Sequence, residues 1–226
     1  MDVRNHGESP EAPEMSFESM VADIKLFIQN LNLNKSILMG HSLGAGIMIS
    51  TALKYPSLVE KIVVIEANPV ESSPSLIKMG ENVNNLSVVN FQGLRTLDEA
   101  RKHADISLRH LILSPVVRER FTGIIKEVSP GKFAWANNFP VIARDMKKNV
   151  IDFMTEQLIA DLKKKPFTKP ALFIGGSQSD FFEIRHYAEI REIFPRAEFA
   201  IIEGGNHWVH LKKPAEVLKI VSEFIN

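Results

Sequence analysis

The segment Gly40-His41-Ser42-Leu43-Gly44 constrains the fold of this chain more than any other stretch. It follows a short apolar run at residues 36–39 and precedes a helical pattern at residues 43–55, which Pro56 ends. A serine between a buried strand and a helix sits where the chain reverses sharply, so side chains two positions away would collide. We therefore expect both glycines to be sterically required, with Ser42 strained and its hydroxyl exposed.

Strand and helix patterns alternate on both sides of this segment. Apolar, β-branched runs without polar alternation occur at residues 62–65, 171–174 and 199–202. Such runs are typical of parallel strands that are buried on both faces. An α/β fold with a mostly parallel sheet flanked by helices is therefore predicted. The accompanying helices are predicted at residues 17–31, 184–193 and 214–225.

Between residues 69 and 166 helical patterns dominate the sequence. We expect this stretch to be a helical cap, inserted into an α/β core of residues 1–68 and 167–226. The apolar side chains of the cap recur at helical spacing, which suits an acyl-binding wall, although ordinary packing explains most of them equally simply. The cap helices are predicted at residues 97–113, 116–128 and 141–162, with a turn at Ser129-Pro130-Gly131-Lys132.

The composition excludes several classes of protein. The 226 residues include 27 basic and 27 acidic side chains, whereas a nucleic-acid-binding protein usually has a basic excess. The chain has no cysteine, which rules out disulfides and thiolate metal sites. No apolar run approaches the length of a membrane span, and the first residues lack the pattern of a signal or transit peptide. We expect no nucleic-acid partner and no stable membrane insertion; a protein partner is left open.

A histidine at the end of the chain suits the role of general base. His207 follows the run at residues 199–202 and precedes the last predicted helix, in the loop Gly204-Gly205-Asn206-His207-Trp208. Together with Ser42 upstream, this order is typical of serine nucleophiles that are activated by an imidazole. His210 is a weaker candidate, and we expect it to be structural.

Two carboxylates are candidates for the residue that orients His207. Asp180 lies in the loop after the run at residues 171–174, and Glu66 directly follows the run at residues 62–65. The carboxyl ends of parallel strands meet at one edge of a sheet, so either carboxylate could accept a hydrogen bond from the imidazole. Loop position favours Asp180, and both remain candidates.

Several stretches together resemble the α/β-hydrolase superfamily, and within it a group of small acyl esterases. The resemblance implies an α/β-hydrolase fold, hydrolysis of acyl esters, and residence in mitochondria in animals. It carries the nucleophile to Ser42 and the base to His207, and it favours Glu66, since relatives often have Asp at that position. The matching stretches are residues 2–10, Gly40-His41-Ser42-Leu43-Gly44, Asn68-Pro69-Val70-Glu71-Ser72, Phe194-Pro195-Arg196-Ala197 and Gly205-Asn206-His207-Trp208-Val209-His210.

The chain departs from this family at its beginning, because relatives have a further stretch before the segment at residues 2–10. We expect the strand at residues 36–39 to be a sheet edge, and the loop with a second oxyanion donor to be missing. A transit peptide would be missing as well, so that the chain as written would be cytoplasmic. These features predict a fold truncated at the N-terminus, from a short isoform, a fragment or an incomplete gene model.

The residues and the resemblance together predict a serine hydrolase. Ser42 would attack the carbonyl of a hydrophobic acyl ester or thioester, and His207 would carry the proton. Asp180 or Glu66 would hold the imidazole, and the amide of Leu43 would stabilise the oxyanion. No metal or organic cofactor is required. The alternatives are an inactive hydrolase-fold protein that binds a lipid or a protein, and a hydrolase of amides or peptides.

Overall fold

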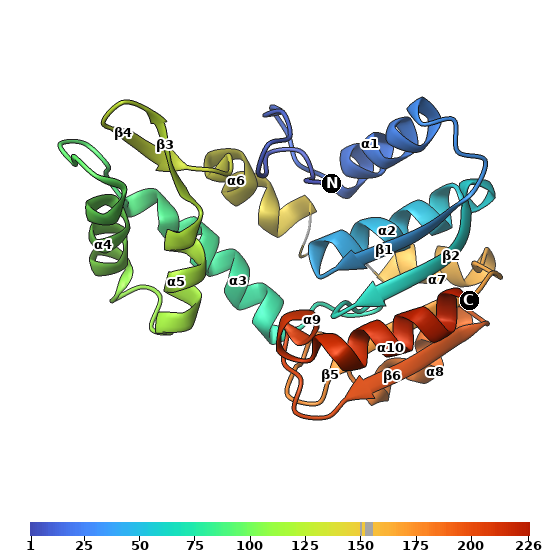
Figure 1. The fold of residues 1–226 in the computed structure, drawn as a ribbon. Coiled ribbons are helices and arrows are strands. Elements are labelled where there is room, and N and C mark those ends of the chain that lie inside the picture. The colour runs from blue at the N-terminus through green and yellow to red at the C-terminus, as the bar shows by residue number, and fades with distance from the viewer. Residues whose placement is uncertain (150, 152–155) are drawn as a thin grey trace. The chain divides into compact units, whose positions relative to one another are not determined.

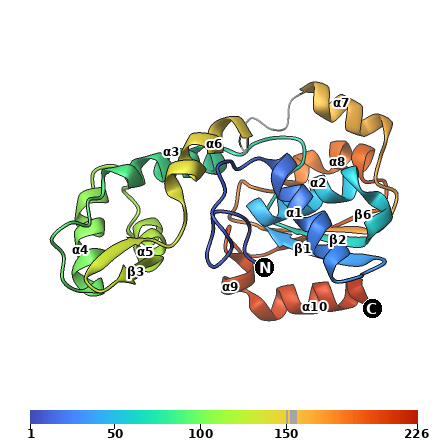
Figure 2. The same cartoon turned by 90° about the horizontal axis from the view of Figure 1, so that it is seen from above.

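The computed structural model of the chain describes residues 1–149, 151 and 156–226. Its helices and strands belong to two compact units, which Figures 1 and 2 show from two directions. The sheet unit consists of Ser16–Leu76 and Lys148–Asn226, and the insertion unit consists of Met1–Met15 and Ile77–Lys147.

The sheet unit is built on four parallel strands in the order β1-β2-β5-β6 (Figure 1). At one end of the strands His41 lies opposite Ile65. Farther across the sheet, Gly176 lies opposite Ile202. All four strands therefore end at the same edge, and the loops that follow them converge there. The strands are β1 (Ser36–His41), β2 (Val59–Ile65), β5 (Ala171–Gly176) and β6 (Ala197–Ile202).

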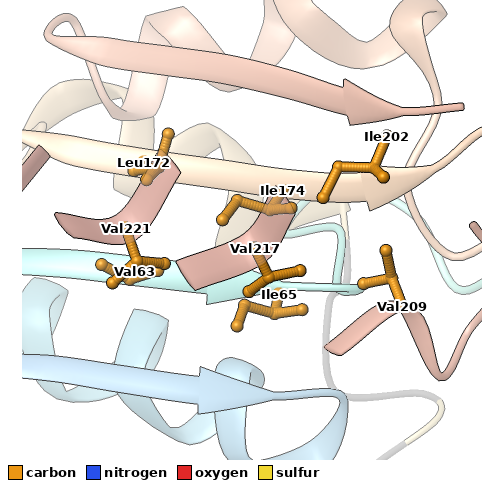
Figure 3. Close-up of a cluster of buried hydrophobic side chains, with 8 residues drawn as sticks. All are labelled: Val63, Ile65, Leu172, Ile174, Ile202, Val209, Val217 and Val221. Carbon is orange, nitrogen blue, oxygen red and sulfur yellow. The ribbon is translucent and has the colours of Figure 1, made fainter. Parts of the chain in front are cut away.

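One face of the sheet is covered by α10 (Pro214–Ile225), with α9 (Val209–Lys212) beside it (Figures 1 and 2). Apolar side chains of the two helices meet those of three strands in a buried cluster (Figure 3). Burial of this kind stabilises the fold by about 25 cal/mol for each Å² of apolar surface removed from water. The cluster contains Val63, Ile65, Leu172, Ile174, Ile202, Val209, Val217 and Val221.

The opposite face is packed by α2 (Leu43–Lys54) and α8 (Tyr187–Ile193) (Figure 2). At its centre is Phe173 of β5, whose ring lies 5.4 Å from that of Phe194 and 5.9 Å from that of Phe182. All three rings are buried. Because both faces of the sheet are covered, its two central strands carry the continuous apolar runs that the sequence predicted.

At the start of the sheet unit, α1 (Phe17–Asn30) packs against α2 and begins with a capping box at Ser16. The side chain of Ser16 accepts a hydrogen bond from the amide of Ser19, and the side chain of Ser19 accepts one from the amide of Ser16. In the part of the chain that the structure describes, β1 is an edge strand, and its residue Met39 is 56% exposed. This agrees with the edge expected for residues 36–39.

The insertion unit contains helices and one β-hairpin. Ala100, Ala104, Ile125 and Phe133 form a buried cluster within it. Leu108, Ile112 and Ile125, which are apolar side chains of the predicted cap, are buried. Its elements are α3 (Pro74–Asn85), which crosses the boundary between the units, α4 (Leu97–Leu108), α5 (Pro115–Gly123), β3 (Ile125–Ser129), β4 (Lys132–Trp135) and α6 (Phe139–Asn149).

The hairpin of β3 and β4 corrects the prediction of a helix at residues 116–128. The helix α5 ends at Gly123, and the chain then pairs antiparallel across a tight turn at Gly131, whose φ is 69°. The predicted turn at Pro130-Gly131 is present, but it joins two strands of a hairpin and does not separate two helices. A Gly at positive φ joins two antiparallel strands readily.

The predicted helix at residues 141–162 corresponds to two helices, α6 and α7 (Glu156–Lys164). Residues 150 and 152–155 of the predicted helix lie outside the described residues. The helix α3 and the short helix α9 were not predicted. The two structural units also divide the chain at other residues than the predicted core and cap, since the first fifteen residues belong to the insertion unit. The role of residues 69–166 as a cap stays a prediction.

Within the described ranges, no helix combines the length and the apolar character that crossing a membrane requires.

Candidate active site

The chain reverses at Ser42, between β1 and α2. Its backbone has φ 55° and ψ −119°, a conformation that residues with a side chain rarely adopt. The amide of Ser42 donates to the carbonyl oxygen of Ile65 at 2.9 Å, which ties the turn to the end of β2. The strain predicted for this position is therefore present.

The two glycines that flank Ser42 are not equivalent. A Cβ atom on Gly40 would lie 2.4 Å from the backbone carbon and oxygen of Gly44, so position 40 requires glycine. A Cβ atom on Gly44 would meet nothing within 4 Å. The expectation that both glycines are sterically required is therefore correct for Gly40 and wrong for Gly44, because the close approach involves the backbone of Gly44 and leaves the space beside its Cα open.

His207 lies in the loop between β6 and α9, and its Nε2 is 3.0 Å from the hydroxyl oxygen of Ser42. This loop approaches the end of β5 closely, since a Cβ atom on Gly176 would lie 2.4 Å from the carbonyl oxygen of Gly205. Glycine at position 176 allows the two backbones to pack together and brings the imidazole to the serine.

Glu66 is the carboxylate that the structure brings to His207. It directly follows β2, has a φ of 57°, and is completely buried. Its Oε2 lies 3.2 Å from Nδ1 of His207, and its Oε1 accepts from the amide of Gly176 at 2.5 Å. Because the ring nitrogen that faces a carboxylate carries the proton, Nε2 is left free to accept from Ser42.

Asp180 has a different partner. Its Oδ2 accepts from the amide of Ser75 at 2.9 Å, in the first turn of α3, where helix amides lack acceptors within the helix. Among the described residues, no hydrogen bond joins Asp180 to His207. The two candidate carboxylates thus follow neighbouring strands at one edge of the sheet but have different partners.

Two further residues contact this array, and neither was predicted from the sequence. The hydroxyl of Ser179 donates to Oε2 of Glu66. The ring of Phe181 stacks on the imidazole of His207, with centroids 3.6 Å apart. Ser179 and Phe181 flank Asp180, and that nearness to a candidate acid was the available signal.

His41 precedes Ser42, and no role was predicted for it from the sequence. Its Nε2 lies 2.6 Å from the carbonyl oxygen of His207, and because a carbonyl only accepts, this nitrogen donates. Burial lowers the pKa of His41 to about 4, partly opposed by this hydrogen bond, so the ring is neutral near pH 7. The ring of His210, the weaker candidate base, packs 4.3 Å from that of His41.

The remaining predicted site residue, Leu43, begins α2. Its amide has no acceptor within the helix, and the N-terminus of a helix carries partial positive charge. An anion that forms beside Ser42 would therefore meet an amide donor and a favourable helix dipole. The described residues contain no group of three or more His, Cys, Asp or Glu side chains that could hold a metal ion.

Comparison with known proteins agrees with this fold. Residues 1–214 match the family described as alpha/beta hydrolase fold. The chain is 30% identical to the sn-1-specific diacylglycerol lipase ABHD11 of Mus musculus, over 100% of this chain and 70% of that protein. It is also 30% identical to a probable alcohol acetyltransferase of Saccharomyces cerevisiae, over 100% of this chain and 67% of that protein.

A solved structure, a marine microorganism esterase, is 29% identical and superposes with a TM-score of 0.83, covering 99% of this chain and 82% of its own. The chain belongs to the α/β-hydrolase family, and within it to the enzymes of esterase and lipase type.

Proposed function

We propose that this chain hydrolyses carboxylic esters or thioesters of hydrophobic acyl groups through Ser42, His207 and Glu66. The observation that carries the proposal is the continuous hydrogen-bonded path from the hydroxyl of Ser42 through the imidazole to a buried carboxylate. Nucleophile, base and orienting acid in hydrogen-bond contact are the arrangement that covalent acyl transfer requires.

In the first half of the reaction, Oγ of Ser42 attacks the carbonyl carbon of the substrate while its proton passes to Nε2 of His207. The buried carboxylate of Glu66 accepts from Nδ1 and stabilises the imidazolium that forms. The amide of Leu43 donates to the oxyanion. As the tetrahedral intermediate collapses, the bond to the leaving alcohol or thiol breaks, and His207 returns the proton to that group. An acyl-serine remains.

In the second half, water replaces the leaving group. His207 takes a proton from the water molecule, the hydroxide attacks the acyl-serine, and the carboxylic acid departs as Oγ of Ser42 regains its proton. These steps are proton transfers and acyl transfers by side chains of this chain.

For the acyl group, we propose a hydrophobic chain of medium or greater length. The support is the name of the murine relative, a diacylglycerol lipase, together with the apolar helices predicted to cap the site. The assignment of Glu66 as the acid is supported by its distance from His207. Asp180 is the alternative acid, and variants of Asp180 test it.

A second candidate function is transfer of the acyl group to an alcohol in place of water. The yeast relative named as a probable alcohol acetyltransferase favours it. Both reactions share the acyl-serine and differ only in whether water or an alcohol takes the acyl group.

The test of the proposal is turnover of p-nitrophenyl esters with acyl chains of two to twelve carbons, by the full chain and by Ser42→Ala. We expect turnover that increases with chain length and falls at least about 10⁴-fold in the variant. Adding ethanol separates the two candidates, because a transferase would form the ethyl ester in preference to the free acid.

Two results would contradict the proposal. Turnover that persists in Ser42→Ala would remove the serine from the mechanism. Absence of both turnover and covalent labelling of Ser42 by a fluorophosphonate would favour an inactive protein that binds a lipid or a protein partner. Cleavage of amides or peptides in preference to esters would move the chain to a different hydrolase class. The mitochondrial location implied by the resemblance stays a prediction, which fractionation of cells that express the tagged chain would test.

A further inference from the structure

The loop after β5 contacts Glu66 through Ser179 and His207 through Phe181. The carboxylate of this loop, Asp180, instead accepts a hydrogen bond from Ser75. We propose that Ser179 is a positioning residue, whose hydroxyl fixes the direction in which Glu66 holds His207. This inference rests on the proposed function, and it adds a fourth side chain to the three named there.

Each oxygen of the Glu66 carboxylate accepts a hydrogen bond from a residue near the end of β5. An ionised carboxylate only accepts, so Ser179 donates to Oε2, the oxygen that also faces Nδ1 of His207. The amide of Gly176 satisfies the other oxygen at 2.5 Å. Both oxygens of the buried carboxylate therefore have donors other than the imidazole.

Glu66 needs these donors because its own geometry leaves the carboxylate free to rotate. The last torsion of a glutamate side chain is broad, so packing alone does not fix the plane of the carboxylate. Two donors on different oxygens define that plane. Since the side chain is completely buried, losing a donor leaves a carboxylate oxygen with one hydrogen bond fewer, which costs free energy.

The loop that carries Ser179 is well placed to hold this position. The amide of Ser177 donates to the carbonyl oxygen of Ile202 at 3.0 Å, and that of Gln178 donates to Gly205 at 2.8 Å. The amide of Ser179 donates to Gly176 at 3.1 Å. Three consecutive backbone hydrogen bonds thus attach the loop to β5, to β6 and to the loop of His207.

Ser179 also reaches the imidazole by a second route. Its hydroxyl oxygen accepts from the amide of Phe181 at 3.3 Å, and the ring of Phe181 stacks on His207 with an interplanar angle of 23°. Phe181 is itself buried. One hydroxyl therefore links the carboxylate at Nδ1 of the imidazole to the aromatic ring on its face.

The experiment measures how fast a fluorophosphonate inactivates Ser42, resolved into the binding constant KI and the rate constant kinact. This readout reports the activated serine without knowledge of the natural substrate. We expect Ser179→Ala to lower kinact about 10- to 100-fold at unchanged KI, because small misplacements of a catalytic group cost this much. Ser179→Thr, which keeps the hydroxyl, should recover kinact to within about threefold of wild type by the same reasoning.

The matched control is Ser87→Ala, which removes an exposed serine hydroxyl that donates to the carbonyl of Asn84 in the insertion unit. It should leave both constants unchanged. Thermal unfolding of each variant shows whether it is folded.

The positioning role is overturned if Ser179→Ala keeps the wild-type kinact, or if Ser179→Thr fails to restore it while both variants unfold at lower temperature. Failure of the proposed function gives a different result. In that case the wild-type chain is not labelled at Ser42 at all, and the inference falls with it.

Discussion

The loop after β2 and the loop after β5 each carry a carboxylate at the same edge of the sheet. Glu66, in the first loop, is completely buried and accepts hydrogen bonds from Gly176, Ser179 and His207. Asp180, in the second, is partly exposed and accepts from the first turn of α3. The last residue of β5 and the loop that holds Asp180 each supply a donor to Glu66, so this loop contacts the proposed acid although its own carboxylate has a different partner. Position in the topology therefore selects candidates, and the donors around each carboxylate distinguish them.

Neutralising each carboxylate in turn tests which of the two holds His207. Glu66→Gln should lower kcat by about 10³- to 10⁴-fold, because an amide no longer favours the imidazole tautomer that accepts from Ser42. Asp180→Asn should stay within about threefold of wild type, since its partner is a backbone amide of a helix. Steady-state kinetics with a p-nitrophenyl ester measure both. Equal losses in the two variants would assign the acid role to neither residue alone, and the opposite order would assign it to Asp180.

His41, at the end of β1, is a partly buried side chain that is uncharged near pH 7. The pKa of His41 is lowered by burial from 6.5 to about 4. Between these values the unfolded chain binds a proton that the folded chain does not, so stability falls as the pH drops through this window and levels off below about pH 4. Between pH 7.5 and pH 5 this loss amounts to about 2 kcal/mol from His41.

Urea unfolding at the two pH values, for wild type and His41→Gln, measures this contribution. Glutamine does not titrate but can still donate to the carbonyl of His207. The variant should therefore lose less stability on acidification than the wild type. An identical loss in both proteins would show that His41 is protonated alike in the folded and unfolded states.

The smallest expected effect concerns stability at Asp180. Asp180→Ala removes the acceptor for the amide of Ser75 and should destabilise the fold by about 1 kcal/mol, the usual cost of a lost helix N-terminal acceptor. The esterase activity per folded molecule should be unchanged. Chemical denaturation gives the free energy of unfolding, and a drop in kcat without a drop in stability would argue against this purely structural role.

The fold of the sheet unit could be predicted because each of its strands contains a continuous apolar run. The apolar runs at residues 36–39, 62–65, 171–174 and 199–202 all lie within observed strands. The insertion unit was harder, since β3 pairs only with β4 and its burial pattern shows a single buried residue, Ile125. A strand with one buried residue has no apolar run in the sequence. The residues of β3 therefore fitted the end of the helix predicted at residues 116–128.

Some residues of the candidate site could be predicted from the local sequence, whereas others depend on contacts between residues far apart in the chain. Ser42 and His207 could be named because each lies at a strand end that the sequence shows. The choice between Glu66 and Asp180 could not be made, because it depends on Gly176 and Ser179, which are more than a hundred residues from Glu66 along the chain. The same holds for His41, whose partner is 166 residues away.

The separation of these residues along the chain has a consequence for synthesis. Ser42 and Glu66 leave the ribosome early, whereas His207 follows Glu66 by 141 residues, after the whole insertion. At about 5–20 residues per second, the nascent chain spends on the order of ten seconds with Ser42 made and His207, its proposed base, not yet translated. During that interval Ser42 lacks the imidazole proposed to activate it, so we expect an abortive product that stops within the insertion to carry an unreactive serine.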